Sequence, residues 1–202
     1  MAELRFSYGV MSAGKSTLAL QVEHTWTEAG RDGLLLTSHD RGGSGVVTSR
    51  LGLRRSAAEV GPATDLDQLL RDVPDAGFVV ADEVQFYAPE QVEALARCVD
   101  ERQVDVACFG LLTDFASRLF PGSARLVELA DVLIPLPLPV VCWCGAPARI
   151  NARLVDGVVV HEGAQVVLGD TGTGSESTLF GPEVRYQVLC RLHWASRQTG
   201  PS

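Results

Sequence analysis

The chain has 202 residues, of which 46% are hydrophobic and 21% charged, a composition typical of a globular protein with one core or one domain plus a small appendage. The formal net charge of −8 argues against binding nucleic acid mainly through phosphate contacts, although a local positive pocket for a small anion stays open. The start, MAELRFSYG, is too charged for a signal peptide, and no apolar run approaches the roughly 20 residues of a membrane helix. We therefore expect a cytoplasmic protein with no membrane partner, in which structural disulfides are rare.

The first two-thirds of the sequence alternates between apolar runs and helical segments. We expect a strand at 4–9, a helix at 17–30, a strand at 33–38, a polar glycine-rich loop at 39–50, a helix at 65–73, a strand starting at 77, a helix at 89–103, a strand at 104–112 and a helix at 124–130. Strands that alternate with helices predict an α/β fold, in which a parallel sheet is flanked by helices on both faces.

The pattern changes near Pro135. Short β-like runs follow at 148–155, 157–162 and 165–169, turn residues separate them, and no convincing helix is predicted. A long loop rich in Gly, Ser and Thr covers 169–183. We divide the chain into an α/β domain at 1–139, a small β-rich domain at 140–194 and a disordered tail at 195–202.

The stretch GVMSAGKS matches the phosphate-loop pattern G-x-x-x-x-G-K-[ST]. In such a loop the backbone N–H groups point at phosphates, and the following helix adds its positive end. Lys15 would reach the outer phosphates and Ser16 would hold Mg²⁺. The alternative is a glycine-rich turn with a solvated lysine, but a strand before the pattern and a helix after it favour a P-loop NTPase-like domain. The residues assigned to nucleotide binding here are Gly9, Val10, Met11, Ser12, Ala13, Gly14, Lys15 and Ser16.

A second acidic motif, ADEVQF, ends the strand that starts at 77. Ligands of open α/β sheets gather at the carboxyl ends of strands, so Asp82 is placed to hold Mg²⁺ opposite the phosphate loop. Glu83 would then orient a water in an ATPase, or act as the base beside an acceptor hydroxyl in a kinase. The alternative is an acidic pair that caps the next helix.

Other candidates are open to two interpretations. Arg41 and Arg118 lie in predicted loops, where each would contact phosphate or simply be solvated. His39 is more simply a surface histidine. Phe86 and Phe115 follow predicted strands and would stack on a base or pack in the core.

Two cysteine-containing pairs indicate a metal site. Cys142 and Cys144 form a C-x-C pair, and Cys190 and His193 form a C-x-x-H pair, which together make a four-ligand set suited to structural Zn²⁺. A small β-rich domain lacks core and gains from a metal, so we expect a zinc-ribbon-like lid. Burial of the first two thiols as packing residues is the alternative. Cys98 and Cys108 are better interpreted as packing residues.

Taken together, these motifs resemble the tetrameric, zinc-containing class of thymidine kinases, from about Leu4 to Trp194. The resemblance is carried, in order, by GVMSAGKST, DRGGSGVVTSRLG, ADEVQF, FGLLTDFASRLFPGS, VVCWCGAPARI and YQVLCRLHW. It implies transfer of the ATP γ-phosphoryl group to the 5′-hydroxyl of thymidine, with deoxyuridine as a further substrate, and a homotetramer.

The resemblance also assigns roles to individual residues. Glu83 matches the catalytic base and Asp82 the Mg²⁺ ligand, while Val84 and Gln85 continue the nucleotide-site motif and Arg41 matches a loop arginine near the phosphates. The residues that it assigns to the nucleoside are Phe86, Phe115, the start of a lasso loop at Val167, Leu168 and Gly169, and Tyr186, which closes the lasso.

Three departures from the family pattern stand out. The phosphate loop reads GVMSAGKS where the family more often has G-P-M-[FY]-S-G-K, the cysteine pair is C-x-C where it has C-x-x-C, and the lasso is considerably longer. Two rival functions follow from the motifs alone. One is a P-loop ATPase or switch without a nucleoside acceptor, and the other is a zinc-ribbon module that binds nucleic acid.

Overall fold

Six short strands form a parallel sheet in the computed structural model, which describes residues 1–38, 45–137, 139–165 and 182–200. The strand order is β5-β2-β6-β7-β1-β8, and every neighbouring pair is parallel. The strands are β1 Leu4–Tyr8, β2 Gly33–Thr37, β5 Ala58–Glu59, β6 Phe78–Ala81, β7 Asp105–Gly110 and β8 Val132–Pro135. The predicted parallel α/β sheet is confirmed, although its strands β5 and β8 were not predicted from the sequence.

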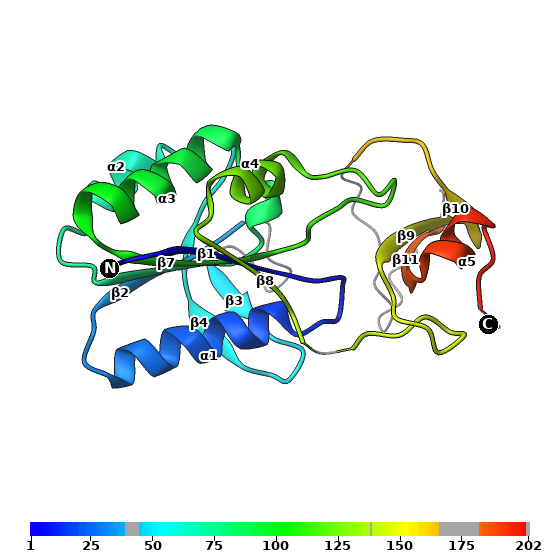
Figure 1. Cartoon of the computed structure of the whole chain (residues 1–202), viewed down its shortest axis with the longest axis horizontal. Helices are drawn as coiled ribbons and strands as arrows, with labels where there is room; N and C mark the ends of the chain where they lie inside the picture. The colour runs from blue at the N-terminus through cyan, green and yellow to red at the C-terminus, as the bar shows by residue number, and fades with distance from the viewer. Residues whose placement is uncertain (39–44, 138, 166–181, 201–202) are drawn as a thin grey trace. The chain divides into compact units, whose positions relative to one another are not determined.

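Helices cover both faces of this sheet because its central strands are apolar on both sides. All four residues of β6 are buried. Helix α1 lies on one face, and α2, α3 and α4 lie on the other (Figure 1). The helices span Lys15–Glu28 (α1), Leu66–Arg71 (α2), Pro89–Arg102 (α3) and Pro121–Leu129 (α4).

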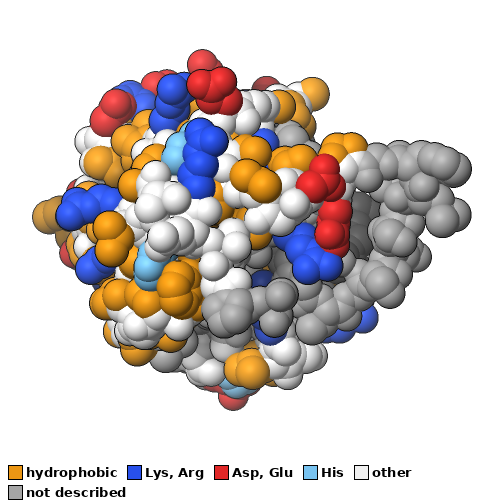
Figure 2. Space-filling model, turned by 90° about the vertical axis from the view of Figure 1, so that its right-hand side faces the viewer, with side chains coloured by type: hydrophobic (Ala, Val, Ile, Leu, Met, Phe, Trp, Pro, Cys, Tyr) orange, Lys and Arg blue, Asp and Glu red, His pale blue; other side chains and the backbone are white. Residues whose placement is uncertain are grey.

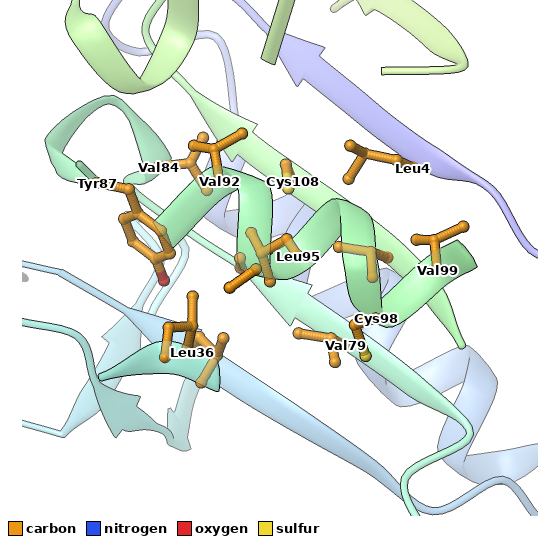
Figure 3. Packing of buried hydrophobic residues seen from close by; sticks show 14 of the residues in the cluster. Leu4, Leu36, Val79, Val84, Tyr87, Val92, Leu95, Cys98, Val99 and Cys108 are labelled. Atoms are coloured by element: carbon orange, nitrogen blue, oxygen red, sulfur yellow. The ribbon is translucent and has the colours of Figure 1, made fainter. Parts of the chain in front are cut away.

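The larger core lies between α3 and the sheet (Figure 3). Val92, Leu95 and Val99 recur at helical spacing and form one buried stripe of α3, and they pack in one cluster with Leu4, Leu36 and Val79 of the strands. Cys98 and Cys108 belong to the same cluster, in agreement with their interpretation as packing residues. Burial raises the pKa of the Cys108 thiol well above its ordinary value, so this cysteine stays a neutral apolar group.

The prediction of a loop at 39–50 is wrong at residues 46–48. Val46–Thr48 forms β3, which pairs antiparallel with β4, Arg54–Ser56. β-Branched residues favour the extended conformation, and Val47 is fully buried in the core on the α1 side. Burial of the Val47 side chain therefore favours a strand in this segment. The polar and glycine-rich residues around it gave no indication of a strand in the sequence.

The chain divides into two compact units. The sheet unit comprises Met1–Gly9, Gly14–Leu112 and Phe120–Pro137. The C-terminal unit comprises Val10–Ala13, Thr113–Leu119 and Leu138–Ser202.

A three-stranded antiparallel sheet forms the frame of the C-terminal unit, in the order β10-β9-β11. The strands span Ile150–Val155 (β9), Val158–Val160 (β10) and Val184–Leu189 (β11). A short helix, α5, follows at Arg191–Ala195, where none was predicted. Five residues are too few to show helical periodicity, so the sequence pattern concealed it.

Charged side chains are dispersed on the face drawn in Figure 2. Among the described residues of this face, Lys and Arg alternate with acidic and hydrophobic side chains and do not gather into one continuous patch. No helix in the described ranges is long and apolar enough to cross a membrane.

Helix α4 packs closely at Gly122 against the turn that carries the acidic motif. A Cβ atom at Gly122 would lie 2.5 Å from the Val84 carbonyl oxygen and 2.6 Å from that of Tyr87, both backbone atoms. We expect Gly122→Ala to lower the free energy of unfolding by about 1–3 kcal/mol in urea titrations.

Gly61→Ala is the matched control, because its new Cβ would meet only the Thr64 hydroxyl at 3.8 Å. Its free energy of unfolding should change by less than about 0.5 kcal/mol. Equal effects of the two substitutions would contradict the tight packing at Gly122.

Candidate active site

The phosphate loop links β1 to α1 and is bent at two residues. Ser12 and Gly14 both adopt positive φ angles, of 67° and 82°, and the N–H of Ala13 donates to the Val10 carbonyl at 3.3 Å. Gly14 is the N-cap of α1 and offers no capping side chain, so N–H groups of the first turn are not satisfied by a cap. Such a bend followed by a helix N-terminus is an anion-binding arrangement.

Lys15, Ser16 and Asp82 converge at the carboxyl end of the sheet. Lys15 is 8% exposed, and its ammonium lies 3.5 Å from the Gly9 carbonyl oxygen. The Ser16 hydroxyl hydrogen-bonds the Asp82 carboxyl group, and the charge of Lys15 acts on the same carboxyl group. The first turn of α1 and the end of β6 therefore face one another within the sheet unit.

Asp82 is the most perturbed carboxyl group of this site. It is 2% exposed, and its Oδ1 atom has no hydrogen-bond partner among the described residues. Burial and the neighbouring charge of Glu83 raise the pKa of Asp82 to about 7, although Ser16 and Lys15 act to lower it. A buried carboxylate oxygen left unpaired beside a serine hydroxyl fits a hydrated Mg²⁺ ion, which prefers oxygen ligands and keeps several waters.

Glu83 is held in an unusual backbone conformation directly after Asp82. Its φ and ψ angles are 55° and 35°, a left-handed conformation that costs a non-glycine residue about 1–3 kcal/mol. The Gln85 amide donates to the Glu83 carboxylate, and Gln85 in turn accepts the N–H of Leu111 at 2.9 Å. Gln85 is 2% exposed, so its contacts hold the half-buried Glu83 side chain from the interior of the protein.

The other residues of ADEVQF have different surroundings. Val84 is fully buried in the main core. Phe86 is half-buried and meets the ring of Phe120 edge-on, with 6.0 Å between centroids. Both aromatic rings belong to the sheet unit.

In the C-terminal unit, Phe115 and Tyr186 come together around Arg153. The Arg153 guanidinium lies 3.7 Å from the Phe115 ring centroid, and its Nε donates to the Tyr186 hydroxyl oxygen at 3.1 Å. Arg41, His39, Val167, Leu168 and Gly169 lie outside the described residues. Arg118 is exposed, and its backbone N–H donates to Asp114.

The sequence analysis missed three buried polar residues of this unit, namely Asp114, Asn151 and Arg153. The Asn151 amide oxygen accepts the N–H of Met11 in the phosphate loop at 2.7 Å, across 140 residues of sequence. The one available signal was the alternation in INARL, where polar side chains occupy every second position of an otherwise apolar strand.

The predicted metal ligands also come together. Cys142, Cys144, Cys190 and His193 offer ligand atoms that all lie within 4.8 Å of one another, an arrangement compatible with a zinc site. The His193 Nδ1 atom lies 3.4 Å from the Cys142 sulfur and 3.5 Å from the Cys190 sulfur, and the Trp143 ring stacks on the imidazole at 4.1 Å.

A tight turn accommodates the C-x-C spacing. The N–H of Cys142 donates to the Ala146 carbonyl at 2.8 Å, and Gly145 adopts a φ of 84°, which favours glycine. Burial raises the pKa of Cys142, but the N–H groups of Cys144 and Cys190 and the His193 ring outweigh burial and lower the pKa to about 6. The thiolate that a metal requires is therefore favoured at this position.

Comparison with known proteins identifies the family. A family model described as "Thymidine kinase" matches residues 2–194. The thymidine kinase of Streptomyces coelicolor is 50% identical over 98% of this chain and 91% of its own. The thymidine kinases of Cutibacterium acnes and Ruegeria pomeroyi are 48% and 40% identical, over 99% and 100% of this chain and 91% and 98% of their own. The resemblance stated from the motifs is confirmed.

Among solved structures, Bacteroides Pif1 bound to single-stranded DNA aligns with 66% of this chain and 38% of its own, at 12% identity. Its TM-score is 0.37, a likeness too slight to carry an argument.

The pKa of Asp82 makes stability depend on pH. The folded-state pKa of about 7 lies above the ordinary value, so ionisation between about pH 4 and pH 7 destabilises the folded protein. We expect Asp82→Asn to stabilise the Mg²⁺-free and nucleotide-free protein, by about 2 kcal/mol more at pH 8 than at pH 5.

Thermal unfolding at the two pH values measures this difference. Asp75→Asn, which alters an exposed carboxylate, should leave the melting temperature nearly unchanged at both pH values. A stabilisation by Asp82→Asn that is the same at pH 5 and pH 8 would rule out a raised pKa.

Proposed function

Because the chain belongs to the thymidine kinase family, it phosphorylates thymidine in nucleotide salvage, and we propose that it transfers the γ-phosphoryl group of ATP to the 5′-hydroxyl oxygen. The observation that carries the proposal is the convergence of Lys15, Ser16, Asp82 and Glu83 within the sheet unit. A phosphate-binding loop and a carboxylate base are the two parts that phosphoryl transfer to an alcohol requires.

The phosphate loop binds the donor. Backbone N–H groups from Gly9 to Ser16 and the Lys15 ammonium hold the phosphates of ATP and stabilise the charge on the transferred group. Ser16 and Asp82 would hold Mg²⁺, which neutralises phosphate charge when it is bound. Arg41 would add a further positive charge near the phosphates.

Glu83 acts as the base of the reaction. Its carboxylate accepts the proton of the 5′-hydroxyl as the oxygen attacks the γ-phosphorus, and ADP leaves with the bridging oxygen. Gln85 holds the Glu83 carboxylate and is itself fixed by the Leu111 N–H, so the base is oriented before the substrate arrives. Val84 buries the turn in the core and so keeps both acidic side chains in place.

The nucleoside is recognised by aromatic rings and main-chain groups. Phe86, Phe115 and Tyr186 would contact thymidine, and Val167, Leu168 and Gly169 would pair with the base through their backbone. Thymine offers two carbonyls and one N–H, which backbone groups are able to pair. A close-fitting pocket for its 5-methyl group would discriminate against deoxyuridine by only about 1–3 kcal/mol, so deoxyuridine is expected as a second substrate.

The proposal includes a homotetramer and a cytoplasmic location, which rest on the resemblance to the tetrameric class of the family. Sedimentation of the purified protein would measure the oligomeric state directly.

Assays with γ-labelled ATP against a panel of nucleosides test the function. We expect label in thymidine monophosphate, a smaller yield with deoxyuridine, and Glu83→Gln to lower kcat by at least about 100-fold because the hydroxyl proton loses its acceptor. The dissociation constant for ATP should change less than about twofold, since Glu83 does not hold the phosphates.

Glu90→Gln serves as the control, because Glu90 is an exposed acid in the first turn of α3. It should retain the wild-type kcat. Near-full activity of Glu83→Gln would contradict the assignment of the base, and ATP hydrolysis that is indifferent to thymidine would instead favour the P-loop ATPase.

We also propose that the Cys142, Cys144, Cys190 and His193 cluster holds a structural zinc ion. Four protein ligands leave no open position for chemistry, so zinc would stabilise the small unit instead of taking part in catalysis. Metal analysis should find about one zinc per chain, and Cys190→Ser or His193→Ala should lose it and lower the melting temperature.

Cys98→Ala is the control for the zinc site, because Cys98 lies in the main core among apolar residues. This variant should keep its zinc. A wild-type protein that is purified without zinc and is not stabilised by added zinc would exclude the structural metal.

A further inference from the structure

Arg153 is a buried arginine in the middle of β9. It is 3% exposed, and among the described residues no carboxylate lies within ion-pair distance of it. Ala152 and Leu154, its neighbours along the strand, point into the apolar cluster that includes Cys142 and Cys190. Arg153 therefore lies on the other face of β9, and since burying an unpaired charge is costly, its position requires an explanation.

Carbonyl and hydroxyl oxygens surround the guanidinium in place of a carboxylate. Nη1 donates to the Ala164 carbonyl at 2.7 Å, and Nη2 donates to the Gln165 carbonyl at 3.0 Å. Nε donates to the hydroxyl oxygen of Tyr186, the residue directly opposite Arg153 in the β9–β11 ladder. Three nitrogen atoms of one planar group thus bind three residues in two segments, an arrangement that suits the fork of an arginine and not a lysine ammonium.

The flat face of the guanidinium covers the Phe115 ring. The distance from the guanidinium carbon to the ring centroid is 3.7 Å, and this desolvated cation–π contact compensates part of the cost of burial. The backbone of Phe115 is held separately, since its carbonyl accepts the Trp194 indole N–H at 3.0 Å. Ring and backbone of Phe115 are therefore fixed by two different elements.

Asp114 holds both the loop that carries Phe115 and the side chain of Gln165. Its Oδ1 atom accepts the N–H groups of Ala116 and Arg118, both at 2.9 Å, and so closes the loop that carries Phe115. Its Oδ2 atom accepts the Gln165 amide at 3.1 Å. Gln165 is thus held through its side chain by Asp114 and through its carbonyl by Arg153.

We propose that Arg153 is a positioning residue for the nucleoside site, one that sets the orientation of the Phe115 ring and the Tyr186 hydroxyl without touching the substrate. The inference rests on the proposed function, in which Phe115 and Tyr186 contact thymidine. An aromatic ring and a hydroxyl group bind a ligand more tightly when their orientation is fixed beforehand, because less conformational entropy is lost on binding. A planar cation that contacts both groups fixes them together.

Substitution of Arg153 should weaken thymidine binding selectively. We expect Arg153→Met, which keeps an apolar stem of similar length, to raise the KM and the dissociation constant for thymidine by about tenfold or more. The KM for ATP should change less than about twofold, and kcat at saturating thymidine should fall less than the thymidine KM rises. The zinc content should equal that of the wild type.

Arg153→Lys gives a second test that keeps the charge and the fold-stabilising stem. A lysine ammonium cannot lie flat on Phe115 while it binds three acceptors, so the same selective rise in the thymidine KM is expected. This variant decides the question if Arg153→Met unfolds, as judged by its melting temperature and zinc content.

Arg185→Met is the matched control. Arg185 precedes Tyr186 on β11, has a side chain that is 65% exposed, and pairs only with Glu183 among the contacts of its guanidinium in the described residues. Its removal should leave the KM values for both substrates unchanged.

The outcomes separate this inference from the proposed function. A wild-type protein that does not phosphorylate thymidine refutes the proposed function. An active wild type combined with a folded Arg153→Lys or Arg153→Met variant whose thymidine KM is unchanged overturns the positioning role alone. Equal rises in the KM values for thymidine and ATP, with a lowered melting temperature, overturn it as well, because they indicate a general loss of structure.

Discussion

The contact between the Ser16 hydroxyl and the buried Asp82 carboxyl group is the interaction on which the rest of the site depends. It joins the first turn of α1 to the end of β6, two strands away from β1 in the sheet. A buried acid with a pKa of about 7 and an unpaired oxygen is unfavourable in the absence of a ligand. The protein retains this unfavourable group because the core on the α1 side, which contains residues of both α1 and β6, holds the two elements in place. Such a group is well suited to a divalent cation and phosphates.

Glu83, the next residue, is also held in an unfavourable state by its surroundings. Its left-handed backbone turns the carboxylate away from the direction that the strand would give it, and the buried Gln85 then holds it. Gly122 of α4 confines this turn, since a Cβ atom there would lie within 2.6 Å of the backbone oxygens of Val84 and Tyr87. Strain at one residue is thus maintained by close packing at several others, a common arrangement at functional sites.

Opposite faces of β9 serve different purposes within the C-terminal unit. Ala152 and Leu154 join the apolar cluster beside the Cys and His ligands, whereas Asn151 and Arg153 bind Met11, Phe115 and Tyr186. A metal on one side of so small a sheet would compensate for its limited core. The same strand then connects the stability of this unit with the orientation of side chains that are proposed to bind the nucleoside.

The sequence by itself determined the features that depend on local spacing. The phosphate loop, the acidic motif after β6, the pairs of metal ligands and the alternation of most strands and helices each occupy a few consecutive residues, whose backbone preferences or apolar periodicity are visible in the chain. The short helix α5 and the strands β3, β4, β5, β8 and β11 were missed because pairing and packing with other segments determine their conformation. Asp114, Asn151 and Arg153 were missed for a different reason. Each has at least one partner that is distant in sequence, as with Asn151 and Met11 at 140 residues. The alternation in INARL, the one local signal, places polar side chains on one face of a strand but does not show that they are buried. Only the tertiary structure decided their roles, because a buried hydrogen bond or cation–π contact is specified by where two segments meet and not by either segment alone.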